Sequence, residues 1–201
     1  MEEKRVPASV YAEMTPNPAT MKFVANKFLV GPDEQADYET MAETKGSSLL
    51  AEELFNFPFV KRVFIAANFV AVTKTDNIDW DFITMELRDY VREFAAQGKE
   101  AVTKLPEAKK EEIKESQPKK VIAESDYDDE IKNLLNEYVR PAVENDGGAI
   151  EYLGFENGKV SVVMKGACSG CPSSSQTLQG GILTLLKEHI PAVEEVVSYE
   201  G

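Results

Sequence analysis

The stretch KGACSGCP, residues 165–172, contains the two cysteines of this 201-residue chain, Cys168 and Cys171, and separates a strand-like run from a helix-like run. Thiolates are soft ligands that suit zinc, copper(I) and iron–sulfur clusters, and they also take part in disulfide exchange. Tetrahedral thiolate sites usually need four sulfurs. Because one chain supplies two, either a second copy of the protein completes the site or the pair carries out redox chemistry alone.

The residues around the two cysteines indicate a turn that leads into a helix. Pro172 fits the first helical position, where its missing N–H leaves no helical hydrogen bond unmade. Cys171 then lies at the helix N-terminus, where the helix dipole favours the thiolate. Gly166 and Gly170 allow backbone N–H groups to approach the sulfurs. We therefore predict two adjacent thiolates on a surface turn; the alternative is two small buried residues in a turn.

Residues 127–201 are predicted to form one α+β domain around this turn. The expected elements are a helix from residue 128, strands at 149–155 and 159–164, a helix after the cysteines and a strand at 193–199. The apolar face of the first helix follows helical spacing, at Ile131, Leu134, Leu135, Tyr138 and Val139. Pro141 is expected to bend or end that helix, and Gly147-Gly148 to form an elbow. Asn157-Gly158 is a strong signal for a hairpin between the two strands.

Residues 1–98 are predicted to form another α+β domain. The expected elements are strands at 9–14, 20–24, 60–65 and 69–73 and helices at 49–55 and from residue 80. Ser47-Ser48 is expected to cap the first of these helices, and Gly98 to end the second. This part of the sequence has no cysteine, no histidine and no glycine-rich phosphate loop, so its residues indicate no chemistry.

Residues 99–126 break both patterns. They include seven lysines, seven acidic residues, two prolines and few large apolar side chains. Such a segment buries too little surface to offset the entropy lost on ordering. We predict a flexible charged linker that joins two small α+β domains; the alternative is a charged, solvent-facing helix.

Composition argues against several classes of function. A formal net charge of −13 without a basic stripe opposes binding to nucleic-acid phosphates. No run approaches the roughly 18 apolar residues that cross a bilayer, so we expect no membrane partner. The opening MEEKR is followed by no apolar segment, so we expect no signal peptide and a cytoplasmic protein. His189, far along the chain from the cysteines, is expected to be structural.

Two sets of motifs resemble the NifU-type, or Nfu, family. Residues 131–197 are similar to its C-terminal domain through four motifs, Glu144–Gly148, Gly166–Ser174, Thr177-Leu178 and Gly181-Ile182. Residues 15–91 resemble its N-terminal domain through Pro16-Asn17-Pro18 and the strands between Phe59 and Val72. The resemblance covers most of the chain outside the predicted linker.

The resemblance implies an iron–sulfur cluster scaffold or carrier and not an enzyme. In this family the Cys-x-x-Cys pairs of two subunits jointly hold a [4Fe-4S] cluster, so Cys168 and Cys171 are expected to bind it in a homodimer; a [2Fe-2S] cluster is the other expected cargo. Upstream iron–sulfur assembly proteins and recipient apoproteins are the implied partners, with a docking role for the N-terminal domain. The further cysteines of full-length NifU are absent here, which favours a carrier over an assembly scaffold.

Two other functions stay open on the sequence. A thiol–disulfide oxidoreductase also places Cys-x-x-Cys at a helix N-terminus after a strand. Against it, no tryptophan lies beside the Cys168–Cys171 pair, and the surrounding pattern is not βαβ. A zinc-bridged structural dimer is the third reading, because four thiolates from two chains also suit zinc.

Overall fold

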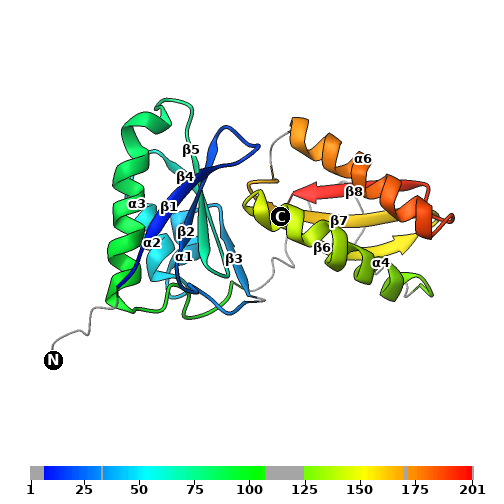
Figure 1. Cartoon of the computed structure of the whole chain (residues 1–201), viewed down its shortest axis with the longest axis horizontal. Helices are drawn as coiled ribbons and strands as arrows, with labels where there is room; N and C mark the ends of the chain where they lie inside the picture. The colour runs from blue at the N-terminus through cyan, green and yellow to red at the C-terminus, as the bar shows by residue number, and fades with distance from the viewer. Residues whose placement is uncertain (1–6, 33, 107–124, 170–171, 201) are drawn as a thin grey trace. The chain divides into compact units, whose positions relative to one another are not determined.

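The computed structural model describes residues 7–32, 34–106, 125–169 and 172–200, the last range without the side chains of 172–175 and 200. The chain divides into two units, residues 1–107 and 108–201 (Figure 1). Each unit combines helices with a sheet of its own, so the predicted α+β class is confirmed. Residues 107–124 of the predicted linker lie outside the described residues. No helix in the described part of the chain is long and apolar enough to cross a membrane.

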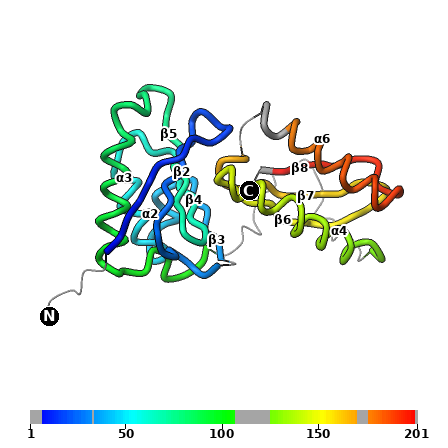
Figure 2. The backbone as a smooth tube through the Cα atoms, in the orientation of Figure 1, coloured from blue at the N-terminus to red at the C-terminus, as the bar shows by residue number. Residues whose placement is uncertain are grey.

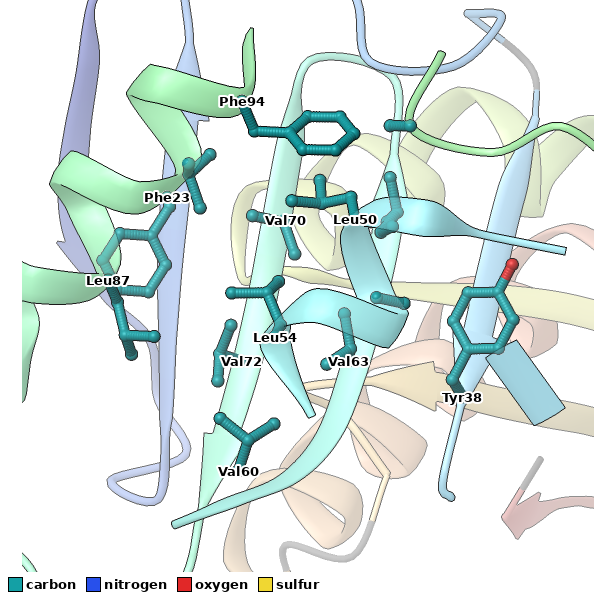
Figure 3. Close-up of a cluster of buried hydrophobic side chains, with 14 of the residues drawn as sticks. Phe23, Tyr38, Leu50, Leu54, Val60, Val63, Val70, Val72, Leu87 and Phe94 are labelled. Carbon is teal, nitrogen blue, oxygen red and sulfur yellow. The ribbon is translucent and has the colours of Figure 1, made fainter. Parts of the chain in front are cut away.

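The first unit is built on a five-stranded antiparallel sheet in the order β1-β2-β5-β4-β3. Its strands are β1 (Val10–Met14), β2 (Thr20–Ala25), β3 (Gln35–Tyr38), β4 (Val60–Ala66) and β5 (Phe69–Lys74). Its helices are α1 (Met41–Thr44), α2 (Leu49–Leu54) and α3 (Trp80–Gln97). Figure 3 shows the core of this unit, where Leu54 of α2 and Leu87 of α3 gather with Phe23, Val70 and Val72 of the sheet.

Local sequence signals account for α2 and α3. The Ser48 side chain accepts a hydrogen bond from the Ala51 N–H at 3.0 Å, as a helix N-cap does. The buried side chains of α3 recur at helical spacing, at Ile83, Leu87, Val91 and Phe94. Gly98 follows α3 with a φ of +69°, in the left-handed region that favours glycine. The predicted cap and the predicted helix end are both confirmed.

The sequence pattern does not predict β3 or α1. Strand β3 has four residues, of which Ala36 and Tyr38 are buried. Between them, the Asp37 carboxylate accepts two hydrogen bonds from the Arg62 guanidinium of β4, at 2.8 and 2.7 Å. The strand forms because it pairs with β4, and a pairing between distant segments leaves little trace in a short local pattern.

The first unit extends past residue 98, where the linker was expected to begin. The N–H groups of Thr103 and Lys104 donate to the Ser47 carbonyl at 2.8 and 3.2 Å. The Ser48 hydroxyl donates to the Ala101 carbonyl at 2.6 Å, and Ala101 is buried. Residues 101–104 are therefore attached to the first unit by hydrogen bonds to Ser47 and Ser48, which lie much earlier in the chain. The composition of residues 99–126 alone does not predict this attachment.

The second unit is a three-stranded sheet in the order β6-β7-β8, with helices packed on it (Figure 2). The strands are β6 (Gly148–Glu156), β7 (Lys159–Gly166) and β8 (Glu195–Glu200). Strands β6 and β7 form the predicted antiparallel hairpin, and Asn157 and Gly158 at its turn both have positive φ, at 51° and 79°. Strands β7 and β8 are parallel, because helix α6 (Pro172–His189) carries the chain back between them. This β7-α6-β8 unit is a βαβ arrangement, so the expectation that no βαβ pattern surrounds the cysteines is wrong, and that argument against an oxidoreductase no longer holds.

The first helical segment of this unit departs from its predicted pattern. Helix α4 (Asp128–Leu134) widens into a π-helical turn, η1 (Leu135–Val139), and continues as α5 (Arg140–Asn145). Pro141 does not end the helix: it follows the π-helical turn directly, and the chain stays helical to Asn145. The wider turn also shifts the phase of the apolar face, so Tyr138 is 54% exposed although the helical spacing predicts it to be buried.

Candidate functional site

A tight turn at the end of β7 carries the first cysteine. Gly166, the last residue of β7, has a φ of +64°, which glycine adopts without strain. The Ser169 N–H donates to the Gly166 carbonyl at 3.1 Å and closes the turn. The Ala167 N–H donates to the Gly147 carbonyl, also at 3.1 Å. The turn is therefore held both internally and by the segment that leads into β6.

Cys168 lies inside this turn and is 6% exposed. It belongs to the apolar core of the second unit, together with Ile150 and Met164 from the sheet. The sequence predicts a thiol on the surface, and the structure places it inside. The reason is that the turn packs against the start of β6. No local sequence pattern around the cysteines predicts this packing.

Gly148 provides the space that Cys168 occupies. A Cβ on Gly148 would lie 2.8 Å from Cys168 Sγ and 2.6 Å from the Lys165 carbonyl oxygen. Ordinary contacts between heavy atoms are about 3.5–4.0 Å, so any side chain at this position would displace the sulfur or the strand. Gly147, with a φ of +82°, forms the predicted elbow. Gly148 is a residue whose role the sequence reasoning missed, and the glycine pair ahead of a strand was its only signal.

Ser169 is buried beside the cysteine, and its hydroxyl is unpaired within the part of the chain that the structure describes. The residue is 7% exposed. Its Oγ has no hydrogen-bond partner among the described residues, and it is the one buried side-chain oxygen or nitrogen there of which this is true. Burying a hydroxyl without a partner destabilises a protein by about 1–3 kcal/mol, so such atoms are uncommon in native structures.

Of the other predicted site residues, Cys171 and Gly170 lie outside the described residues, directly before α6 begins at Pro172. The structure therefore places one of the two predicted ligands. Within the described ranges, no three side chains of His, Cys, Asp or Glu come together as a metal site. His189 is exposed in the last turn of α6, with Nδ1 3.1 Å from the Leu185 carbonyl oxygen of its own helix.

A hydrogen bond between helix α4 and strand β6 supports the strand on which Cys168 rests. The Tyr152 hydroxyl donates to Asp128 Oδ1 at 2.6 Å. Burial, and then this bond to a carboxylate, raise the pKa of Tyr152 above its ordinary value. The phenol therefore keeps its proton, and this hydrogen bond, at alkaline pH as well as at neutral pH. The bond ties the beginning of α4 to the strand that starts at Gly148.

Comparison with known proteins identifies the family. Residues 10–98 match the model of the scaffold protein Nfu/NifU N-terminal domain, and residues 131–197 match the NifU-like domain. NifU-like protein 5, mitochondrial, of Arabidopsis thaliana is 36% identical over 198 residues, which cover 96% of this chain and 69% of the relative. The chain belongs to the Nfu/NifU family. The resemblance predicted from its motifs is confirmed.

Two further relatives match this Nfu-family chain over most of its length. NifU-like protein 4, mitochondrial, of Arabidopsis thaliana is 37% identical over 191 residues, or 93% of this chain and 64% of the relative. The NFU1 iron-sulfur cluster scaffold homolog, mitochondrial, of Drosophila ananassae is 34% identical over 187 residues, or 93% of this chain and 63% of the relative. The chain thus spans a little under two thirds of the length of these two proteins.

Among solved structures, the solution structure of a NifU-like protein from Saccharomyces cerevisiae matches 52% of this chain and 90% of its own, with a TM-score of 0.44 and 21% identity.

The predicted cytoplasmic location is contradicted by the curated relatives, whose names describe them as mitochondrial. Because the chain spans only part of those relatives, its first residues carry no information on location.

Proposed function

We propose that this Nfu-family chain carries an iron–sulfur cluster as cargo, and that two copies hold each [4Fe-4S] cluster through Cys168 and Cys171. The observation that carries the proposal is the supply of sulfur: the sequence contains two cysteines, and a shell of four thiolates requires two chains. Both cysteines belong to the short connection between β7 and α6, so a two-fold axis beside that connection brings four sulfurs together. The same shell also suits a [2Fe-2S] cluster.

The surroundings of Cys168 support the assignment. The turn from Gly166 to Ser169 is closed by its own hydrogen bond, and Gly148 leaves room for the sulfur. At the next position lies a buried serine hydroxyl that has no partner among the residues described. Of these features, the serine hydroxyl is the one that could serve as a hydrogen-bond donor to an anionic sulfur, and such donors stabilise the charge of a thiolate.

Cluster loading requires the sulfur of Cys168 to become accessible, because the side chain is buried in the isolated chain. A change confined to the turn is sufficient for this, since Gly166 at its start can take up new backbone angles at little cost. In this proposal Gly148 and the residues of β7 before Gly166 do not move. We expect slow alkylation of Cys168 in the folded chain without cluster.

The proposed role is binding and release, with no catalytic residue. A cluster held at an interface between two copies becomes exposed when the copies separate, which suits transfer to a recipient apoprotein. Upstream iron–sulfur assembly proteins are the proposed donors. The first unit has no cysteine, so we assign it to docking of these partners, whereas the predicted domain at residues 127–201 holds the cargo.

The experiment is anaerobic reconstitution with ferrous iron and sulfide, followed by analysis of iron, zinc and acid-labile sulfide. The expected result is iron and sulfide in equal amounts, lost in both Cys168→Ser and Cys171→Ser. Ser161→Ala is the matched control, because Ser161 lies toward the other end of β7 and is expected to bind cluster as the natural chain does. Zinc without sulfide would support a structural zinc dimer, and a titratable disulfide without iron would support an oxidoreductase; either result rejects the carrier role.

A further inference from the structure

The hydroxyl of Ser169 differs from the other buried polar side-chain atoms of the described residues in its lack of a hydrogen-bond partner. Among the described residues, every other buried side-chain oxygen and nitrogen has a hydrogen-bond partner. Ser169 is 7% exposed, so water does not readily serve as its partner. Alanine would fill the same volume without the buried polar group. A hydroxyl at this position is therefore unfavourable in the chain as it stands.

The position of Ser169 restricts which acceptor could bind its hydroxyl. It follows Cys168 directly, and its own N–H is engaged by the Gly166 carbonyl at 3.1 Å. The N–H of Ser169 is thus already used in the chain without cluster, and its side-chain hydroxyl is the donor of this residue that has no partner among the described residues. Thiolate sulfurs and the sulfides of an iron–sulfur cluster are anionic acceptors, which form the stronger class of hydrogen bond.

We propose that the Ser169 hydroxyl donates a hydrogen bond to the bound cluster, either to a bridging sulfide or to a ligating cysteine sulfur. This inference rests on the proposed carrier function and adds a positioning residue to it. The hydroxyl destabilises the empty chain and stabilises the loaded one. It therefore biases the protein toward the cluster-bound state, and it does so through a residue that is not itself a ligand.

The proposal predicts effects of opposite sign in the empty and loaded proteins. In the chain without cluster, Ser169→Ala removes an unpaired buried hydroxyl, so the thermal midpoint of the second unit is expected to rise by roughly 4–8 °C. In the loaded protein the same change removes a bond to an anionic acceptor, so loss of the cluster to an iron chelator is expected to be about tenfold to a hundredfold faster. A purely structural serine would not give this reversal.

The reduction potential supplies an independent readout. Hydrogen bonds to cluster sulfurs help set the potential of iron–sulfur centres, since they stabilise the added negative charge of the reduced state. Ser169→Ala is therefore expected to shift the potential of the loaded protein to a more negative value. Ser169→Thr keeps the hydroxyl and is expected to retain the potential of the natural chain, which separates the hydroxyl from the shape of the side chain.

The test compares the full-length natural chain, Ser169→Ala, Ser169→Thr and the control Ser161→Ala, each reconstituted anaerobically with ferrous iron and sulfide. A higher melting temperature without cluster, together with faster cluster loss and a lower potential in Ser169→Ala alone, supports the proposal. An unchanged or lower melting temperature, or an unchanged rate of cluster loss, overturns it. If the natural chain itself takes up no cluster, the carrier function fails; if it does and Ser169→Ala behaves identically, only the role of Ser169 fails.

Discussion

The contact between Gly148 and Cys168 predicts that Gly148→Ala destabilises the second unit and weakens cluster binding. The added Cβ would lie 2.8 Å from Cys168 Sγ and 2.6 Å from the Lys165 carbonyl oxygen. To reach ordinary contact, the sulfur or the strand must move by roughly 1 Å. Overpacking of this kind costs about 1–3 kcal/mol. Alanine also lowers the conformational entropy of the unfolded chain, which stabilises the folded state by about 0.4–1 kcal/mol. Because this gain is smaller than the cost of overpacking, we expect a net loss of stability.

The assay separates the two units. Trp80 is the single tryptophan of the sequence and lies in the first unit, so its fluorescence follows that unit, whereas circular dichroism reports both. Gly148→Ala is expected to lower the urea midpoint of the dichroism transition and leave the fluorescence midpoint unchanged. After reconstitution, the variant should also lose its cluster faster, because the ligand has been displaced.

Gly180→Ala is the matched control. Gly180 lies on the exposed side of α6, and a Cβ there would meet no heavy atom within 4 Å. Since glycine is a poor helix former, this substitution is expected to stabilise the second unit by about 0.8–1 kcal/mol. If Gly148→Ala unfolds at the same urea concentration as the natural chain and retains its cluster equally well, the idea that Gly148 makes room for Cys168 is refuted.

Three further predictions concern the Ser48 cap, the Tyr152 hydrogen bond and the role of the first unit. Ser48→Ala removes both a helix cap and the bond to the Ala101 carbonyl. The urea midpoint followed by Trp80 fluorescence should therefore fall by an amount equivalent to about 1–3 kcal/mol. An unchanged midpoint would contradict the conclusion that the residues after α3 are part of the first unit. Burial and the bond to Asp128 raise the pKa of Tyr152, so above about pH 10 the unfolded chain releases the phenolic proton more readily, and stability should fall as pH rises. Tyr152→Phe should flatten that part of the pH profile, and an equally steep fall would reject the assignment. Removal of residues 1–107 should leave cluster content intact and slow delivery to some apoproteins; equal delivery to every apoprotein tested would reject the docking role.

The sequence was informative where short-range chemistry decides the structure. The Asn157-Gly158 turn, the Ser48 cap and the end of α3 at Gly98 each depend on a few neighbouring residues, and each appears as predicted. The cysteine motif likewise identified the family from a short stretch. In these cases one residue type satisfies a local backbone requirement that others do not.

The sequence was less informative where distant segments meet. Strand β3 depends on pairing with β4, and the π turn η1 alters the helical phase that the periodic pattern assumes. The burial of Cys168 depends on a glycine at the start of another strand. That the Ser169 hydroxyl has no partner in the described ranges follows from the folded surroundings and from no local sequence pattern. These features belong to packing, which residue spacing alone does not encode.

The most direct test of the account is the mass of the iron-loaded protein, measured without oxygen by native mass spectrometry. The account predicts a species of two chains with a single [4Fe-4S] cluster, which separates into lone chains when the cluster is chelated. Cys168→Ser and Cys171→Ser should each appear only as cluster-free protein. A loaded species of one chain, with no external thiol completing its shell, would contradict the sharing of the cluster between two copies.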